Sequence, residues 1–119
     1  MTALLLALAL AAPAPAPAQT PSHTGFYTLR VGAGQTRAIE FGIPTRLATE
    51  NRPLSFTWRI IRPVPAPKFV FIEYCVDPER CLQAIMQPTG QSSGTQRSAF
   101  RIINKSALDL AVEIRFALW

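Results

Sequence analysis

The C-terminal segment is the feature that most constrains the fold, because its side chains alternate strictly between two kinds of position. One set is entirely apolar: Leu108, Leu110, Val112, Ile114, Phe116 and Leu118. The positions between them include Asp109, Glu113 and Arg115. Successive side chains of a β-strand point to opposite faces, so a period of two residues is typical of a half-buried strand. The segment therefore predicts a long strand with one face on a core.

Short segments with similar strand character, separated by turn residues, fill most of the remaining chain. Strands are predicted at residues 26–31, 36–41, 54–62, 68–76, 80–87 and 98–103. Residues 45–52 are compatible with one helical turn or a loop, and residues 87–96 read as a loop rich in glycine and serine. About six to eight short strands spaced in this way predict an all-β protein. The expected fold is a small antiparallel β-sandwich, immunoglobulin-like or similar to a carbohydrate-binding module.

The N-terminal region reads as a targeting segment followed by one domain. An unbroken apolar run at residues 3–12 precedes an alternating Ala-Pro tract and a small-residue pattern ending at Ala18. This arrangement predicts a cleavable secretory signal peptide at residues 1–18, and the run is too short to span a bilayer. Residues 19–25 are expected to be a flexible tail and residues 26–119 a single β-sandwich domain without a stable membrane anchor. The expected location is the periplasm.

The two cysteines, Cys75 and Cys81, flank a turn that contains Asp77 and Pro78. A redox centre would need a C-x-x-C spacing at a helix N-terminus, and a structural metal site would need further Cys or His ligands. The pattern instead favours a disulfide across a β-hairpin in an oxidising compartment. Closing this short loop should stabilise the fold by about 2.4 kcal/mol.

If Cys75 faces Cys81, the antiparallel register follows along both strands. Glu73 then faces Gln83, Phe71 faces Ile85, and Phe69 faces Gln87. The partners of each pair lie close enough for their side chains to touch.

The sequence carries no recognisable catalytic constellation. The mature chain holds one histidine, His23, which falls in the predicted tail, where it cannot be positioned as a general base. The carboxylates that could serve glycoside hydrolysis lie at a turn tip or on polar strand faces: Glu73, Asp77, Glu79, Asp109 and Glu113. We therefore expect no enzyme activity, no catalytic residues, no metal and no cofactor.

Twelve Lys and Arg against seven Asp and Glu give a net charge of +5. A basic surface favours anionic partners, although a mild excess is also ordinary for a soluble protein. The basic residues form no run and no basic-aromatic RNA-recognition module. Together with export, this argues against nucleic acid as a partner.

The candidate binding surface is therefore sought among large side chains. Trp58 shares a face with Leu54, Phe56 and Ile60 and is expected in the core. Tyr74 should face away from the disulfide, whereas Phe69, Phe71 and Ile85 share the disulfide face and form an exposed apolar patch if that face is not the core side. The candidates are Trp119, Arg115, Phe69, Phe71 and Tyr74.

An ordered set of short motifs resembles the flagellar periplasmic protein family FlhE. The matching residues, within 54–94, are Trp58-Arg59, Pro63, Pro65, Cys75, Arg80-Cys81 and Gly90-Gln91-Ser92. The cysteine spacing here is one residue longer than in the family pattern. The resemblance implies a periplasmic β-sandwich without catalysis that binds flagellar export or structural components in a chaperone-like manner. It also implies a role in limiting proton leak through the export gate.

Two function classes are compatible with these features. An accessory protein with flagellar partners should present aliphatic and Phe side chains at a sheet edge or face. A small carbohydrate-binding module for cell-wall or surface glycan should instead present coplanar Trp or Tyr rings with amide and carboxylate neighbours. The exposed surface distinguishes the two.

Overall fold

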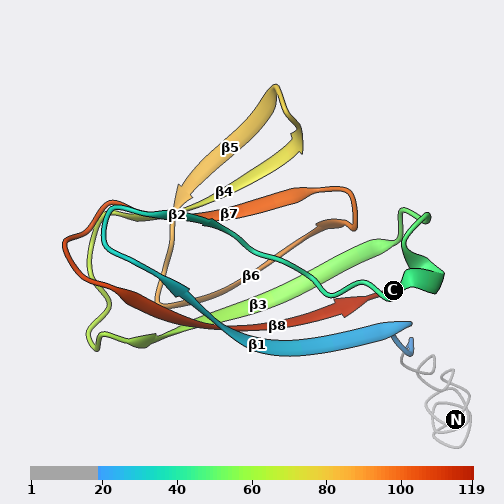
Figure 1. The fold of residues 1–119 in the computed structure, drawn as a ribbon, viewed down its shortest axis with the longest axis horizontal. Coiled ribbons are helices and arrows are strands. Elements are labelled where there is room, and N and C mark those ends of the chain that lie inside the picture. Colours follow the sequence, from blue (N-terminus) through green and yellow to red (C-terminus); the bar gives the residue numbers. More distant parts are fainter. Residues whose placement is uncertain (1–18) are drawn as a thin grey trace, which may run out of the picture.

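The computed structural model describes residues 19–119, and its regular structure consists of β-strands in two layers and one short 3-10 turn (Figure 1). The strands are β1 (His23–Val31), β2 (Thr36–Ala38), β3 (Pro53–Arg62), β4 (Val70–Asp77), β5 (Arg80–Ile85), β6 (Thr89–Thr95), β7 (Ala99–Asn104) and β8 (Leu110–Leu118). A single 3-10 turn, η1 (Thr45–Leu47), lies between β2 and β3. The predicted β-sandwich is confirmed. The predicted signal peptide, residues 1–18, lies outside the described residues.

The strand order is that of a jelly roll. The first sheet runs β1-β8-β3-β6 and the second sheet runs β2-β7-β4-β5, with all pairs antiparallel. The pairs β4–β5, β3–β6, β2–β7 and β1–β8 are nested around one turn. Within residues 19–119, β4 and β5 are the only consecutive strands that share a sheet. This eight-stranded order is that of the jelly roll and differs from the immunoglobulin order.

The core lies between the inner faces of the two sheets. The first sheet contributes Leu54, Phe56, Trp58 and Ile60 of β3 and the apolar residues of β8, which are Leu110, Val112, Ile114, Phe116 and Leu118; the second sheet contributes Phe100 and Ile102 of β7. Leu108, expected on the same buried face, instead precedes β8 and is 51 % exposed. Phe41, from the segment after β2, enters between the layers, where its ring centroid is 5.3 Å from that of Phe56 and 5.2 Å from that of Phe116. Each fully buried large apolar side chain contributes about 1.5–3 kcal/mol relative to its exposed state.

A buried asparagine ties the loop before β8 to the end of β1. Asn104 is 1 % exposed, and its side-chain amide donates to the carbonyls of Val31, Gly32 and Leu108 at 2.7–3.2 Å. Its Oδ1 accepts hydrogen bonds from the Ser106 amide and hydroxyl. All of its polar atoms are therefore satisfied inside the protein, as burial of an amide requires.

Three further expectations from the sequence are corrected. Residues 87–96, expected to be a loop, contain β6, which pairs with β3 over its whole length. Strand β1 begins at His23, so residues 23–25 pair with β8 rather than forming part of a tail. Phe69 does not face Gln87 in a strand, because it precedes β4 with φ of 65°.

Glycine at two positions allows β6 to lie close against large aromatic rings. A Cβ on Gly90 would overlap the indole of Trp58, and a Cβ on Gly94 would lie 3.1 Å from the Phe100 ring. The large rings of the neighbouring strands thus occupy the volume that side chains of β6 would take. Close approach of this kind is a common reason for glycine inside a strand.

We expect Asn104→Ala to lower the free energy of unfolding by about 3 kcal/mol, because it leaves buried carbonyl and amide groups without partners. The measurement is urea denaturation followed by tryptophan fluorescence. Asn51→Ala is the matched control, because Asn51 is exposed and makes one weak contact to the Arg97 amide at 3.3 Å. Equal effects of the two substitutions would contradict the assigned role of Asn104.

Candidate interaction surface

Strands β4 and β5, residues 70–85, form an arm that rises from the second sheet, away from the first (Figure 1). We call this pair the hairpin arm. Its predicted register is confirmed: Cys75 faces Cys81, Glu73 faces Gln83, and Phe71 faces Ile85. The disulfide between Cys75 and Cys81 is formed, and it lies on the outer face of the sheet.

The outer face of the second sheet is arranged in rows across the strands. An apolar row consists of Ile103, Phe71 and Ile85 on β7, β4 and β5. The next row consists of Arg101, Glu73 and Gln83, and the third of Ala99 and the two half-cystines. The face that carries the disulfide is therefore a solvent-side face, with its apolar row at one end and the arm's turn at the other.

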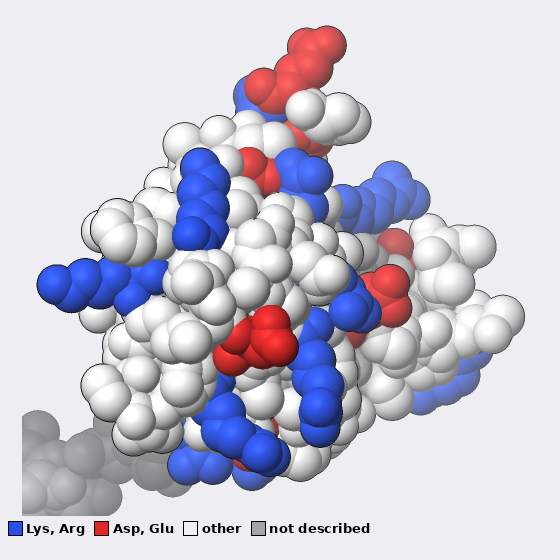
Figure 2. Space-filling model, turned by 60° about the vertical axis from the view of Figure 1, so that its left-hand side comes forward, with Lys and Arg blue, Asp and Glu red and all other residues white. Residues whose placement is uncertain are grey.

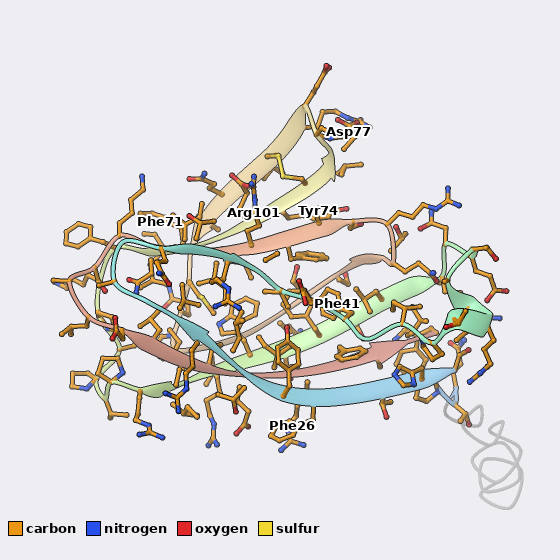
Figure 3. The ribbon with its side chains drawn as sticks, viewed as in Figure 1. Phe26, Phe41, Phe71, Tyr74, Asp77 and Arg101 are labelled. Atoms are coloured by element: carbon orange, nitrogen blue, oxygen red, sulfur yellow. A yellow bond between two sulfur atoms is a disulfide. The ribbon has the colours of Figure 1, made fainter. Side chains whose placement is uncertain are left out.

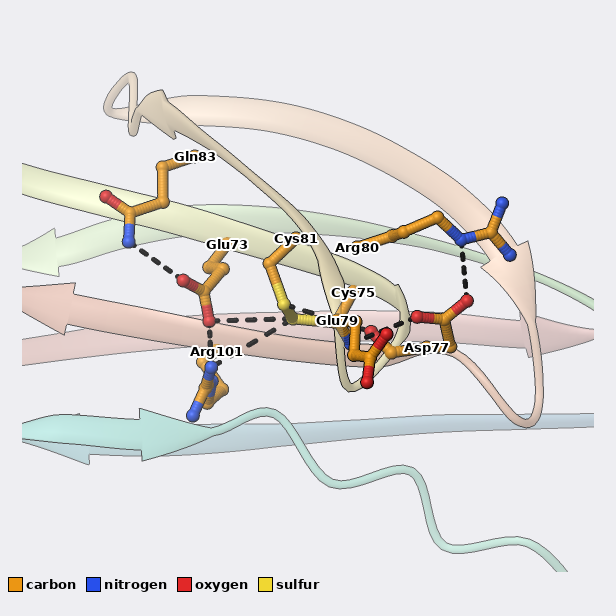
Figure 4. Close-up of a disulfide and its surroundings, with 8 residues drawn as sticks. All are labelled: Glu73, Cys75, Asp77, Glu79, Arg80, Cys81, Gln83 and Arg101. Carbon is orange, nitrogen blue, oxygen red and sulfur yellow. Dashed lines mark hydrogen bonds and ion pairs between the residues drawn. A yellow bond between two sulfur atoms is a disulfide. The ribbon is translucent and has the colours of Figure 1, made fainter.

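Glu73 is the centre of the polar row, and only 7 % of this residue is exposed (Figure 4). Its carboxylate accepts a hydrogen bond from Gln83 Nε2 at 2.8 Å and forms an ion pair with Arg101. The pKa of Glu73 is held below its usual range, mainly by the hydrogen bond from Gln83 and then by the contact with Arg101. Hydrogen bonds to the charged form of a carboxylate stabilise that form.

Glu73, Cys75 and Cys81 also bring potential metal-ligand atoms within 4.8 Å of one another. The two sulfurs are bonded to each other, so neither is a thiolate available for coordination. The group therefore supports the interpretation of the cysteines as a staple.

The arm ends in a charged turn. Asp77 Oδ1 accepts a hydrogen bond from the Glu79 amide at 3.0 Å, and Asp77 Oδ2 pairs with Arg80 Nε at 2.6 Å. The first contact is the local side-chain bond expected of aspartate in a turn. Charged groups accordingly cluster at the tip of the arm, at the top of the space-filling view (Figure 2).

The flanks of the arm carry exposed aliphatic side chains, of which the sequence analysis singled out only Ile85. Leu82 is 73 % exposed and Ile85 69 % exposed, and Val76 is also exposed. Ile85 lies on the outer face, whereas Leu82 faces inward, opposite Tyr74. The sequence shows which residues of β5 share a face. It does not show that both faces are exposed, because this depends on the position of the arm.

A groove separates the inner face of the arm from β6. It has a volume of about 370 Å³, and we call it the edge groove. Its lining includes Trp58, Tyr74, Leu82, Ala84, Gly90 and Ser92. The inward-facing residues of β6 are Gly90, Ser92 and Gly94. None of them has a side chain large enough to fill the edge groove. The groove is thus apolar on the side of the arm and open because β6 supplies little volume.

The five candidate surface residues fall into two groups. Phe71 and Tyr74 lie on β4 of the second sheet (Figure 3), and Phe69 immediately precedes that strand. Phe69 is 67 % exposed, and Phe71 has the Lys105 ammonium 5.6 Å from its ring centroid. Tyr74 faces away from the disulfide, as expected, and stacks on the Phe100 ring at a centroid distance of 4.9 Å. It therefore belongs to the floor of the edge groove rather than to the outer patch.

Trp119 and Arg115 lie on the outer side of the first sheet, away from the phenylalanines. Trp119 Nε1 donates to Ser55 Oγ at 3.0 Å, and its carbonyl accepts from Arg52 Nη1 at 3.0 Å. The Arg115 guanidinium is 4.5 Å from the ring centroid of Phe26, an exposed residue of β1. These contacts occupy the indole N–H and one face of the Phe26 ring.

The chain has no match among protein-family models and none among curated proteins. A similar chain among the solved structures is described as "The Structure of Tomato Aspermy Virus by X-Ray Crystallography". It shares 9 % sequence identity, with 98 % of this chain and 92 % of that chain covered, at a TM-score of 0.43. A likeness at this level carries no functional conclusion.

Within residues 19–119, no helix is both long enough and apolar enough to cross a bilayer.

The depressed pKa of Glu73 predicts a pH-dependent contribution to stability. A carboxylate whose pKa is lower in the folded state stabilises the fold above its unfolded pKa of about 4.3, and this contribution is lost as pH falls through the folded value. We therefore expect Glu73→Gln to lower the Tm at pH 7, and the difference from wild type to shrink as pH falls below about 4. Thermal scans by circular dichroism across this pH range test this, and a pH-independent difference would contradict it.

The left-handed backbone conformation of Phe69 predicts a substitution that raises stability, in contrast to Glu73→Gln. A non-glycine residue in the left-handed region is disfavoured by about 1–2 kcal/mol. Since its side chain is largely exposed, Phe69→Gly should raise the free energy of unfolding by about 1 kcal/mol in urea denaturation. The control is Phe26→Gly, an exposed phenylalanine within β1, which should be destabilising.

Proposed function

We propose that this protein is a non-catalytic periplasmic accessory protein of the flagellar apparatus that binds flagellar export or structural components through the hairpin arm. The proposal joins two independent supports. One is the exposed apolar surface of the arm, and the other is the resemblance of residues 54–94 to the flagellar periplasmic family.

The observation that carries the binding role is the exposure of Val76, Leu82 and Ile85 on one projecting element. Aliphatic side chains gathered at a sheet edge are typical of a surface that receives another polypeptide. The disulfide holds β4 to β5 near the tip, so the arm can remain paired where it receives little packing from the first sheet. A stapled element of this kind suits an oxidising compartment.

A glycan-binding role receives less support from the aromatic residues. Trp58 is buried, Tyr74 is stacked in the groove floor, and Trp119 is bonded through its indole to Ser55. Trp and Tyr rings in the described part of the chain are therefore not gathered on one exposed face. We accordingly favour a protein partner over cell-wall or surface glycan.

Two consequences follow for the proposed role. A stapled, apolar arm can hold an exported flagellar segment before it is assembled, which is a chaperone-like function without catalysis. By the same resemblance, we propose that binding at the export apparatus limits proton leak through its gate. Both consequences require that the arm contact a flagellar polypeptide directly.

We expect the double variant Leu82→Ser/Ile85→Ser to weaken partner binding by about tenfold or more, because it removes two apolar contacts from the interface. Both side chains are exposed, so the Tm should change little. Photo-crosslinking in cells, with a benzophenone side chain at position 82 or 85 of the otherwise unchanged chain, identifies the captured polypeptide. The effect of the double variant is measured as the fall in capture of that polypeptide by a benzophenone at position 76, an exposed residue of the arm that the variant leaves available. Swimming and cytoplasmic pH are followed in the same strains.

The matched control is Leu108→Ser, which changes an apolar residue of 51 % exposure in the loop before β8. A crosslinker at Thr28, on the outer face of the first sheet, is the positional control. The proposal predicts flagellar polypeptides at positions 82 and 85 but not at position 28. Capture of no flagellar polypeptide at the arm, or equal loss of binding in the control variant, would overturn it.

A further inference from the structure

The edge of β6 presents free backbone hydrogen-bonding groups. The bonds from Ile60 N to the Pro88 carbonyl and from Gln96 N to the Arg52 carbonyl lie at the two ends of the β3–β6 ladder. Alternate residues of an antiparallel strand bond to the same neighbour, so the even-numbered residues of β6 bond to β3. Thr89, Gln91 and Ser93 therefore direct their N–H and C=O groups away from β3. Within residues 19–119, no strand pairs with β6 on that side.

This edge lacks the usual protections against strand pairing. Residues 89–95 contain no charge and no proline, and the strand is seven residues long. At the opposite side of the sandwich, the edge strand β2 has three residues, one of which is Arg37. Short length, charge and proline are the devices by which natural sheets block their edges. By this measure, β6 is an open edge.

The side chains above this edge are apolar and uncovered. Leu82 and Ala84 point inward from β5, but the residues that face them from β6 are Gly90 and Ser92. The Trp58 indole covers Gly90, and the space between this surface and β5 remains open as the edge groove. An additional strand beside β6 would place every second side chain on the inner side of the sheet, toward Leu82 and Ala84.

We propose that β6 receives an extended segment of the partner polypeptide as an added strand of the first sheet, with apolar side chains at alternate positions that enter the edge groove. This is recognition by strand addition, in which backbone bonds supply affinity and side-chain pockets supply specificity. A second copy of this chain does not fit as the occupant through its own β6, because glycine and serine there would leave the groove unfilled. The inference rests on the proposed polypeptide-binding function and specifies the class of partner segment.

The test uses the whole mature chain, labelled with 15N, and a synthetic probe peptide. The probe is about as long as a strand, with alternating threonine and valine between terminal lysines. We expect its addition to shift the amide signals of Gln91 and Ser93 saturably and to slow their hydrogen exchange at least about tenfold. A peptide of the same composition with its valines contiguous should bind at least about tenfold more weakly. The same affinity for both peptides would overturn the proposal.

Two variants separate backbone pairing from groove filling. Ser93→Pro removes an outward N–H without breaking a bond to β3, and proline is tolerated at such an edge position. Ser92→Leu keeps the edge intact but places a side chain in the edge groove. Each should weaken probe binding at least about tenfold. Thr28→Ala, which changes an exposed outer-face side chain of β1 at the other edge of the first sheet, should bind as wild type.

The possible results have distinct meanings. Unchanged binding by both Ser93→Pro and Ser92→Leu would overturn strand addition at β6, as would probe-induced shifts confined to β1. Protection of Ser93 that rises with protein concentration in the absence of probe would identify a second copy as the occupant and would also overturn the proposal. Partner crosslinks at positions 82 and 85 that persist in Ser93→Pro would refute strand addition while leaving the proposed function intact.

Discussion

The nested pairing around the turn between Asp77 and Arg80 is the constraint on which the rest of the structure depends. β4 pairs with β5, and the pairs outside it, β3–β6, β2–β7 and β1–β8, join segments that lie progressively farther apart in the chain. Each outer pair closes a longer loop than the pair inside it. Because the entropic cost of loop closure grows only slowly with loop length, each further pair adds little to this cost once the inner pair has formed. The disulfide fixes the innermost pair in register and thereby defines which residues face outward along the second sheet.

Local patterns were sufficient to predict much of this architecture. The alternation at residues 108–119 anticipated β8, because a half-buried strand needs no knowledge of its neighbours to be recognised. The same holds for the inward face of β3 and for the facing pairs Cys75–Cys81 and Glu73–Gln83. For these two pairs, the turn residues and the short stretch of chain between the partners determine the register. The strand order was not predictable in this way, because the connections other than β4–β5 pass from one sheet to the other.

The failures have a common physical origin in tertiary context. Residues 89–95 have the composition of a loop, but they pair with β3, and glycine at positions 90 and 94 leaves room for the rings of Trp58 and Phe100. The candidate surface was similarly incomplete. Sequence parity placed Phe71 on the disulfide face and Tyr74 on the other, both as found. It could not show that the arm diverges from the first sheet, which is what leaves Leu82 exposed.

An open sheet edge also affects how the protein behaves among copies of itself. The free backbone groups of an unprotected edge strand are a template for pairing with other chains, and such pairing is a route to ordered self-association. The net charge of +5 acts against such encounters, since like-charged molecules repel one another over a distance set by the surrounding salt. The arginine-rich composition therefore opposes self-association. It keeps apart molecules whose open sheet edge is suited to binding other strands.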